Sequence, residues 1–186
     1  MCPDGTLAVS NHSRVVIYTL GRFELVLNGA PLRFKGRAPM RPLDLLTALV
    51  AAGEGGASAG RLADQLWPDS DGFDAYRALT TALHRLRALL QCADAVRLSA
   101  GRLMLDTDIC TVDAWTFERA LRGAADSEAV GAVLDMYPGP FLLDDTKPWA
   151  IEMRERLERL IARKSGRIWN GFRPWKGGGL VSAFAS

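Results

Sequence analysis

The stretch that constrains this chain most is residues 75–93, because it contains no acidic residue and has two unlike sides. At the helical spacing of about 100° per residue, one side is an apolar stripe. The stripe consists of Ala75, Leu79, Leu83, Leu86 and Leu90. The other side carries Arg77, Thr80, Thr81, His84 and Arg85, with Arg87 at its edge. A solvated helix normally mixes both charge signs, since opposite charges three or four residues apart stabilise it. Cations, hydroxyls and an imidazole without acids suit phosphate oxygens and base edges, so we predict a DNA-contacting helix over about 74–91.

Charge is divided unevenly along the 186 residues, although the net charge is only +2. Residues 14–105 hold 12 basic and 8 acidic side chains, whereas residues 106–166 hold 8 basic and 12 acidic ones. The last twenty residues carry three bases and no acid. This distribution predicts a polyanion-binding unit joined to a second unit with another role.

Composition excludes several other classes of protein. The hydrophobic share of 48% is ordinary for a globular chain, so a packed core is expected. Cys2, Cys92 and Cys110 are odd in number and lack metal-ligand spacing, and with only His12 and His84 beside them no zinc site is expected. No apolar run approaches the roughly 20 residues that span a bilayer, and the N-terminus lacks a signal-peptide pattern. We therefore expect a cytoplasmic protein without metal, cofactor or membrane contact.

The first part of the chain has strand and helix signals in succession. Residues 15–34 predict a β-ribbon, in which Asn28-Gly29 is a strong hairpin signal and Leu32 and Phe34 continue the return strand. A helix follows, with Pro42 in its first turn and Gly53 as its stop.

Residues 53–60 are rich in glycine but lack the ending of a phosphate-binding loop, so we interpret them as a turn. Ser58 is expected to cap a short second helix that ends at Pro68, and Asp74 to cap the long third helix. Alternating residues in 96–105 predict a hairpin around the tetrad 99–102.

This order of elements is that of an α+β winged helix-turn-helix, in which a helical core is followed by a β-hairpin, the wing. The leading β-ribbon favours the response-regulator variety. From residue 106 onward the pattern predicts helices only, over about 111–123, 126–137 and 148–167, with Glu152–Arg156 and Glu155–Arg159 as surface pairs. The expected organisation is a flexible arm (1–13), a winged-helix domain (14–107), a small all-α, TPR-like segment (108–169) and a disordered tail (170–186).

Three motifs in this order resemble a known family. Residues 76–90 (YRALTTALHRLRALL) are similar to the recognition helix of SARP/AfsR-type (Streptomyces antibiotic regulatory protein) transcriptional regulators. Residues 66–69 (LWPD) resemble the turn before that helix in the same family. Residues 137–142 (YPGPFL), followed by Trp149 and residues 154–157 (RERL), resemble the start of the bacterial transcriptional activation domain.

The resemblance implies an OmpR-like winged helix that places its third helix in the major groove of double-stranded promoter DNA, with the 96–105 hairpin as wing. It also implies a helical domain that forms a homodimer or contacts RNA polymerase. Family members usually continue with further helical pairs, so residues 108–169 are expected to be a partial activation domain.

Some candidate contacts have two readings. Arg87 either binds a phosphate or pairs with an acidic residue inside the domain. Arg102 at the wing tip either approaches the minor groove or is a solvated turn residue. Arg97 is a weaker candidate of the same kind as Arg102. Trp67 either packs on the core or offers its indole N–H to a phosphate. Trp149 and Tyr137 are expected to be core anchors of the second domain.

Two other functions are alternatives to DNA binding. The chain can be a protein-interaction adaptor that uses its winged helix and helical segment without DNA, because fold does not fix function. Enzymatic activity would need a catalytic cluster, and Asp106, Asp108 and Asp113 are better explained as linker and helix-cap residues. We therefore expect no catalytic residues.

Overall fold

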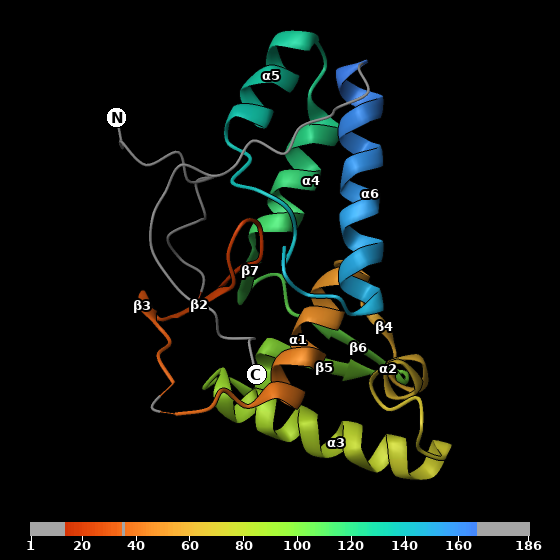
Figure 1. Cartoon of the computed structure of the whole chain (residues 1–186). Coiled ribbons are helices and arrows are strands. Elements are labelled where there is room, and N and C mark those ends of the chain that lie inside the picture. The colour runs from red at the N-terminus through yellow and green to blue at the C-terminus, as the bar shows by residue number, and fades with distance from the viewer. Residues whose placement is uncertain (1–13, 35, 167–186) are drawn as a thin grey trace.

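The computed structural model describes residues 14–34 and 36–166 (Figure 1). The predicted arm (1–13) and tail (170–186) lie outside the described residues. No helix in the described ranges is both long enough and apolar enough to cross a lipid bilayer.

The N-terminal sheet contains four strands in the order β3-β2-β1-β7. β1 (Val15–Tyr18) and β2 (Glu24–Leu27) are antiparallel, and β3 (Ala30–Pro31) follows β2 through the predicted hairpin at Asn28-Gly29. Both turn residues have positive φ, as a two-residue hairpin requires. The predicted return strand is shorter than expected: β3 ends at Pro31, and the Leu32 N–H still donates to the Leu25 carbonyl at 2.7 Å, but Phe34 lies beyond the strand.

The fourth strand of this sheet was not predicted. β7 (Cys110–Val112) pairs in parallel with β1, with Val15 opposite Cys110. The helix predicted from residue 111 therefore begins only at Asp113, the first residue of α4 (Asp113–Gly123). A strand of three residues is too short to show an alternating pattern in the sequence.

The winged helix-turn-helix is present as predicted. α1 (Met40–Ala52), α2 (Ala59–Leu66) and α3 (Gly72–Leu89) precede a short 3-10 turn, η1 (Ala93–Ala95), and the hairpin of β5 (Val96–Ser99) and β6 (Arg102–Leu105). The Ser58 hydroxyl accepts the Arg61 N–H and so caps α2. The predicted cap of α3 is wrong: Asp71 is the cap and accepts the Asp74 N–H at 2.8 Å, so the helix starts three residues nearer the N-terminus than a cap at Asp74 would allow.

The glycine-rich stretch before α2 is only partly a turn. It contains β4 (Ala57–Ser58), which pairs with β6 to give a second sheet of order β4-β6-β5. Gly56 has φ +61°, and a Cβ there would lie 2.0 Å from the carbonyl oxygen of Leu103. Glycine at this position thus lets the wing pack directly on the connection between α1 and α2.

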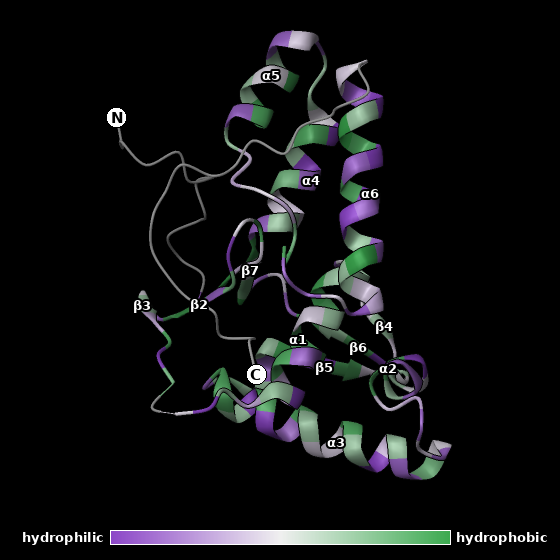
Figure 2. Ribbon diagram, in the orientation of Figure 1, coloured by the Kyte–Doolittle hydropathy of each residue, from purple (hydrophilic) through white to green (hydrophobic). Residues whose placement is uncertain are grey.

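The remaining helices, α5 (Ser127–Asp135) and α6 (Pro148–Ser165), pack with α4 above the winged helix (Figure 1). In Figure 2, α6 shows alternating hydrophilic and hydrophobic bands, as expected of a helix with one buried side. The Glu155–Arg159 pair is formed at 3.3 Å, whereas the predicted Glu152–Arg156 pair is wrong. Arg156 instead donates to Glu118 on α4 and to the carbonyl oxygen of Ala51 on α1.

Helix α1 joins the two parts of the molecule. All its residues from Pro42 to Val50 are buried, so it is covered on every side by α2, α3, α6 and the wing. The Trp149 indole N–H donates to Thr47 Oγ1 at 3.1 Å, and the Trp115 indole N–H donates to the Val50 carbonyl at 2.8 Å. Trp149 is buried as predicted, and Tyr137 lies with its ring centroid 4.8 Å from that of Phe117. Contacts span the predicted domain boundary at 107/108, because β1 pairs with β7 and α1 packs against α6. The boundary itself stays a prediction.

Candidate nucleic-acid interface

Helix α3 buries one side and leaves the other bare. Its buried side chains, which face α1 and α2, are Ala75, Leu79, Ala82, Leu83 and Leu86. The five side chains predicted to form the opposite face are all exposed to solvent in the described structure: Arg77, Thr80, Thr81, His84 and Arg85. The periodicity in the sequence therefore placed these residues correctly.

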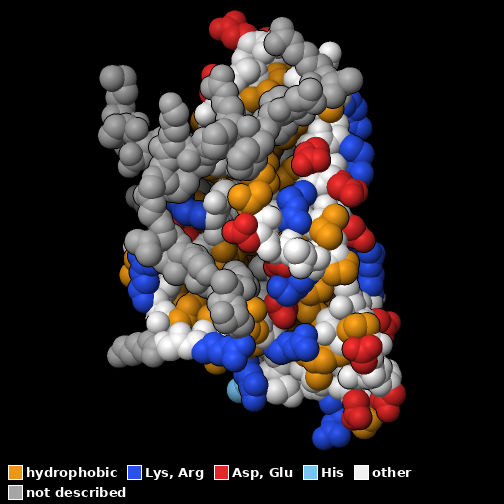
Figure 3. Space-filling view, viewed as in Figure 1, with side chains coloured by type: hydrophobic (Ala, Val, Ile, Leu, Met, Phe, Trp, Pro, Cys, Tyr) orange, Lys and Arg blue, Asp and Glu red, His pale blue; other side chains and the backbone are white. Residues whose placement is uncertain are grey.

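The C-terminal helices leave this face open. α3 lies at one end of the molecule, with α4 and α5 at the opposite end (Figure 1). Figure 3 shows Lys and Arg side chains gathered beside the histidine at the α3 end. His84 is the histidine within the described ranges, so these cations adjoin the predicted face.

The ion pair on this face is local and weak. Arg77 Nη1 lies 3.7 Å from Asp74 Oδ1, and both side chains are more than half exposed. Exposed pairs of this kind contribute about 0–1 kcal/mol and are screened by salt. A phosphate or a guanine edge can therefore replace Asp74 as the partner of Arg77 at little cost.

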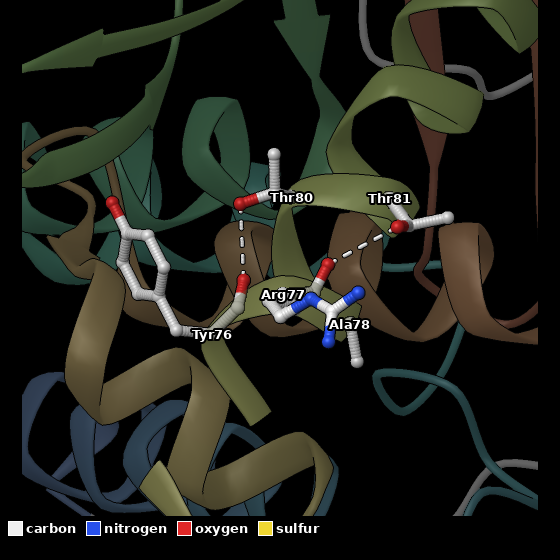
Figure 4. A pocket seen from close by; sticks show the side chains of 5 residues that line it. All are labelled: Tyr76, Arg77, Ala78, Thr80 and Thr81. Atoms are coloured by element: carbon white, nitrogen blue, oxygen red, sulfur yellow. Dashed lines mark hydrogen bonds between the residues drawn. The ribbon is translucent and has the colours of Figure 1, made fainter. Parts of the chain in front are cut away.

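The two threonines present methyl groups more readily than hydroxyl hydrogens. Thr80 Oγ1 donates to the Tyr76 carbonyl at 3.0 Å, and Thr81 Oγ1 donates to the Arg77 carbonyl at 3.1 Å (Figure 4). These side chains line a shallow, open hollow together with Tyr76, Arg77 and Ala78. Because both hydroxyls already donate within the helix, each can still accept a hydrogen bond and offer its methyl group to a base.

Arg87 binds a backbone carbonyl of the wing. It is half-buried and donates from Nε and Nη2 to the carbonyl oxygen of Val96, at 3.1 and 2.7 Å. The guanidinium therefore ties α3 to the first strand of the wing. This is a structural role, and the expected carboxylate partner inside the domain is wrong, while a phosphate contact of Arg87 stays a prediction.

The arginines of the wing are also held by the protein itself. Arg102 Nη2 donates to the carbonyl oxygens of Gly55 and Gly56, so its side chain ties the start of β6 to the residues just before β4. Arg97 pairs with Asp106, whose carboxylate is buried. Arg102 is exposed to solvent while it braces the wing, and its approach to the minor groove stays a prediction.

Trp67 packs against the core, as the first of its two interpretations predicts. It is half-buried against the core, and the Arg41 guanidinium lies over its ring at 5.6 Å from the centroid. Arg41 also donates from Nη1 to the Leu66 carbonyl at the end of α2. The pair thus fixes the turn between α2 and α3.

The sequence analysis missed two exposed aromatic side chains on α3. Phe73 is 73% exposed and Tyr76 is 47% exposed. Both lie in the first turns of the helix, but the cap assigned to Asp74 had placed Phe73 in a loop. The motif Asp71-x-x-Asp74 is the signal that would have included Phe73, since the capping carboxylate accepts the N–H three residues further on.

The arrangement is suited to binding a polyanion and offers no metal chemistry. In the parts of the chain that the structure covers, no three His, Cys, Asp or Glu side chains come together where they could hold a metal ion. Asp113 is buried and accepts hydrogen bonds from Thr19 and Leu20, and Asp106 pairs with Arg97, so both serve the fold.

Comparisons with known proteins bear on the fold. No protein-family model and no curated protein matches the sequence. The structure is similar to that of Mycobacterium tuberculosis EmbR in complex with a low-affinity phosphopeptide, with a TM-score of 0.61 and 18% sequence identity. The match covers 81% of this chain and 43% of the EmbR chain, so this chain spans less than half the length of that protein. The chain therefore has the α+β fold of the matched part of EmbR, a winged helix joined to a helical segment.

Proposed function

We propose that this chain is a sequence-specific DNA-binding transcriptional regulator of the SARP type. The observation that carries the proposal is the bare outer face of α3, where five polar and cationic side chains are exposed. In this proposal α3 lies in the major groove of double-stranded promoter DNA and the β5–β6 hairpin lies beside it as the wing.

Two independent lines support this proposal. The motifs at residues 66–69, 76–90 and 137–142 resemble SARP regulators in the expected order. The fold matches that of EmbR across most of the chain. A homodimer and contact with RNA polymerase belong to the same proposal, since the resemblance implies them for the helical segment.

The dimensions of the face suit one stretch of groove. Arg77 and Arg85 are eight residues apart, which is about 12 Å along a helix axis. Arginine recognises guanine through O6 and N7, while threonine methyls suit the thymine methyl. The face can thus read a short half-site of mixed sequence.

The Arg85→Ala variant is expected to bind its operator about 1–3 kcal/mol more weakly than the wild type, because the exposed guanidinium is the base-reading group at the C-terminal end of the face. Thermal melting should stay unchanged, since Arg85 is exposed. A gel-shift titration on a site selected from random DNA measures the affinity. Arg159→Ala is the control, because Arg159 is an exposed arginine in a surface pair on α6. Equal affinities for Arg85→Ala and wild type would remove Arg85 from the interface.

A protein-interaction adaptor is the second candidate, and the exposed aromatic rings of Phe73 and Tyr76 are the observation that favours it. Salt dependence separates the two functions. Contact with phosphates makes log K fall with log salt by about 0.9 for each phosphate neutralised. We expect a steep fall for the wild type on DNA of any sequence. No measurable DNA binding at low salt would favour the adaptor.

A further inference from the structure

We infer that Phe73 is a specificity-determining residue that contacts the C5-methyl group of a pyrimidine, thymine in ordinary DNA. This inference rests on the proposed function, because it names a base feature read by the same face of α3. It assigns a role to the most exposed large hydrophobic side chain among the described residues, 73% exposed where the others are 41–47% exposed.

Phe73 belongs to the proposed reading face by its position. It precedes Arg77 by four residues and His84 by eleven, so all three lie on one side of the helix within about three turns. It is the second residue of α3, after the Asp71 cap and Gly72. In helix-turn-helix proteins the first residues of the recognition helix contact base edges, together with later residues on the same face.

The Phe73 ring lies beside a cation. The Arg77 guanidinium lies 5.7 Å from the ring centroid, and Arg77 also faces Asp74 at 3.7 Å. The guanidinium covers part of the ring, while most of the side chain remains open to solvent. Phe73 and Arg77 therefore form one unit, with an apolar surface beside a cation.

The chemistry of the ring selects its partner. A phenyl ring has no donor for a phosphate and no acceptor for an amino group. On the major-groove edges of the four bases, the thymine methyl is the apolar feature that such a ring can cover. The methyl groups of Thr80 and Thr81 extend the same apolar character along the face, since their hydroxyls donate to the helix backbone.

The test replaces each thymine of a selected site in turn by deoxyuridine, which lacks only the methyl group. In the wild type, one replacement is expected to weaken binding about three- to tenfold, the effect of one methyl group buried on an apolar surface. The Phe73→Ala variant should lose the same factor on the unmodified site and become insensitive to that replacement. Phe73→Leu, which keeps apolar bulk, should retain sensitivity.

The controls separate this inference from the proposed function. Leu143→Ala removes an exposed hydrophobic side chain, 47% exposed, from the loop before α6, and should keep the wild-type deoxyuridine profile. A Phe73→Ala variant with the wild-type profile would overturn the inference and leave Phe73 as a contact for a protein partner. Wild-type binding without sensitivity to any deoxyuridine would also overturn it. Wild-type protein that binds no DNA would overturn the proposed function itself.

Discussion

A chain that ends at Thr107 is expected not to fold, although it contains every element of the winged helix. Such a chain lacks β7 and helices α4–α6, which pair with β1 and pack on α1. Because α1 is buried continuously from Pro42 to Val50, loss of α6 exposes one full side of it. Each large apolar side chain returned to water costs about 1.5–3 kcal/mol, and a few of them equal the about 5–15 kcal/mol that stabilises a typical domain.

The polar contacts of α1 lead to the same expectation. The carbonyls of Val50 and Ala51, at the C-terminal end of α1, accept hydrogen bonds from Trp115 and Arg156. Truncation removes the Arg156 donor from Ala51 and leaves the Val50 carbonyl with the Gly53 N–H, at 3.1 Å, in the turn that ends α1.

Circular dichroism during thermal denaturation measures the effect. A chain of residues 14–166 is the matched control and should melt cooperatively, whereas residues 14–107 should show little ordered structure and no sharp transition. A cooperative melt of the shorter chain would instead establish an independent domain with the predicted boundary at 107/108.

Replacement of Asp113 by alanine is expected to lower the free energy of unfolding by about 3–5 kcal/mol. Its buried carboxylate accepts hydrogen bonds from the backbone N–H groups of Thr19 and Leu20 and from the Thr19 hydroxyl, at 2.8–2.9 Å. It also accepts the Ala114 N–H at 2.7 Å. Alanine would leave these donors buried without an acceptor, and each such group costs about 1–3 kcal/mol. The loss would separate the end of β1 from the start of α4.

Urea denaturation of the purified variants measures this change. Asp126→Ala is the control, because Asp126 is an exposed cap of α5 whose carboxylate accepts the Ala129 N–H at 2.8 Å, and its loss should cost about 1 kcal/mol. Asp113→Asn should fall between wild type and Asp113→Ala, since its amide nitrogen would face an N–H donor. Equal decreases in the free energy of unfolding for Asp113→Ala and Asp126→Ala would show that the buried carboxylate stabilises the fold no more than an exposed helix cap does.

The sequence predicted the parts of the fold that depend on local signals. The turn at Asn28-Gly29, the cap at Ser58 and the hairpin of β5 and β6 each follow from a few adjacent residues. The strand β7 and the partners of Asp113 depend on contacts more than ninety residues apart in the chain. No neighbouring residue signals such a contact, so the sequence could not reveal it.

The candidate site shows the same division. The exposed face of α3 follows from helical periodicity, which is a local property. The partners of Arg87 and Arg102 are backbone carbonyls of Val96, Gly55 and Gly56. Every residue has a backbone carbonyl, so the sequence does not indicate which one an arginine will bind. A charge pattern identifies which arginines exist on a surface but not which ones the fold already uses.

The connection between the wing and β7 is a tight turn at residues 106–109, closed by a hydrogen bond from the Cys110 N–H to the Asp106 carbonyl. No long linker therefore separates the winged helix from helices α4–α6. If α3 occupies the groove as proposed, α4–α6 project from the duplex in one set direction. Two copies bound to sites one helical turn apart, about 10 base pairs, would then have their α4–α6 helices on the same side of the duplex. The two sets of helices would lie next to each other and form one continuous surface.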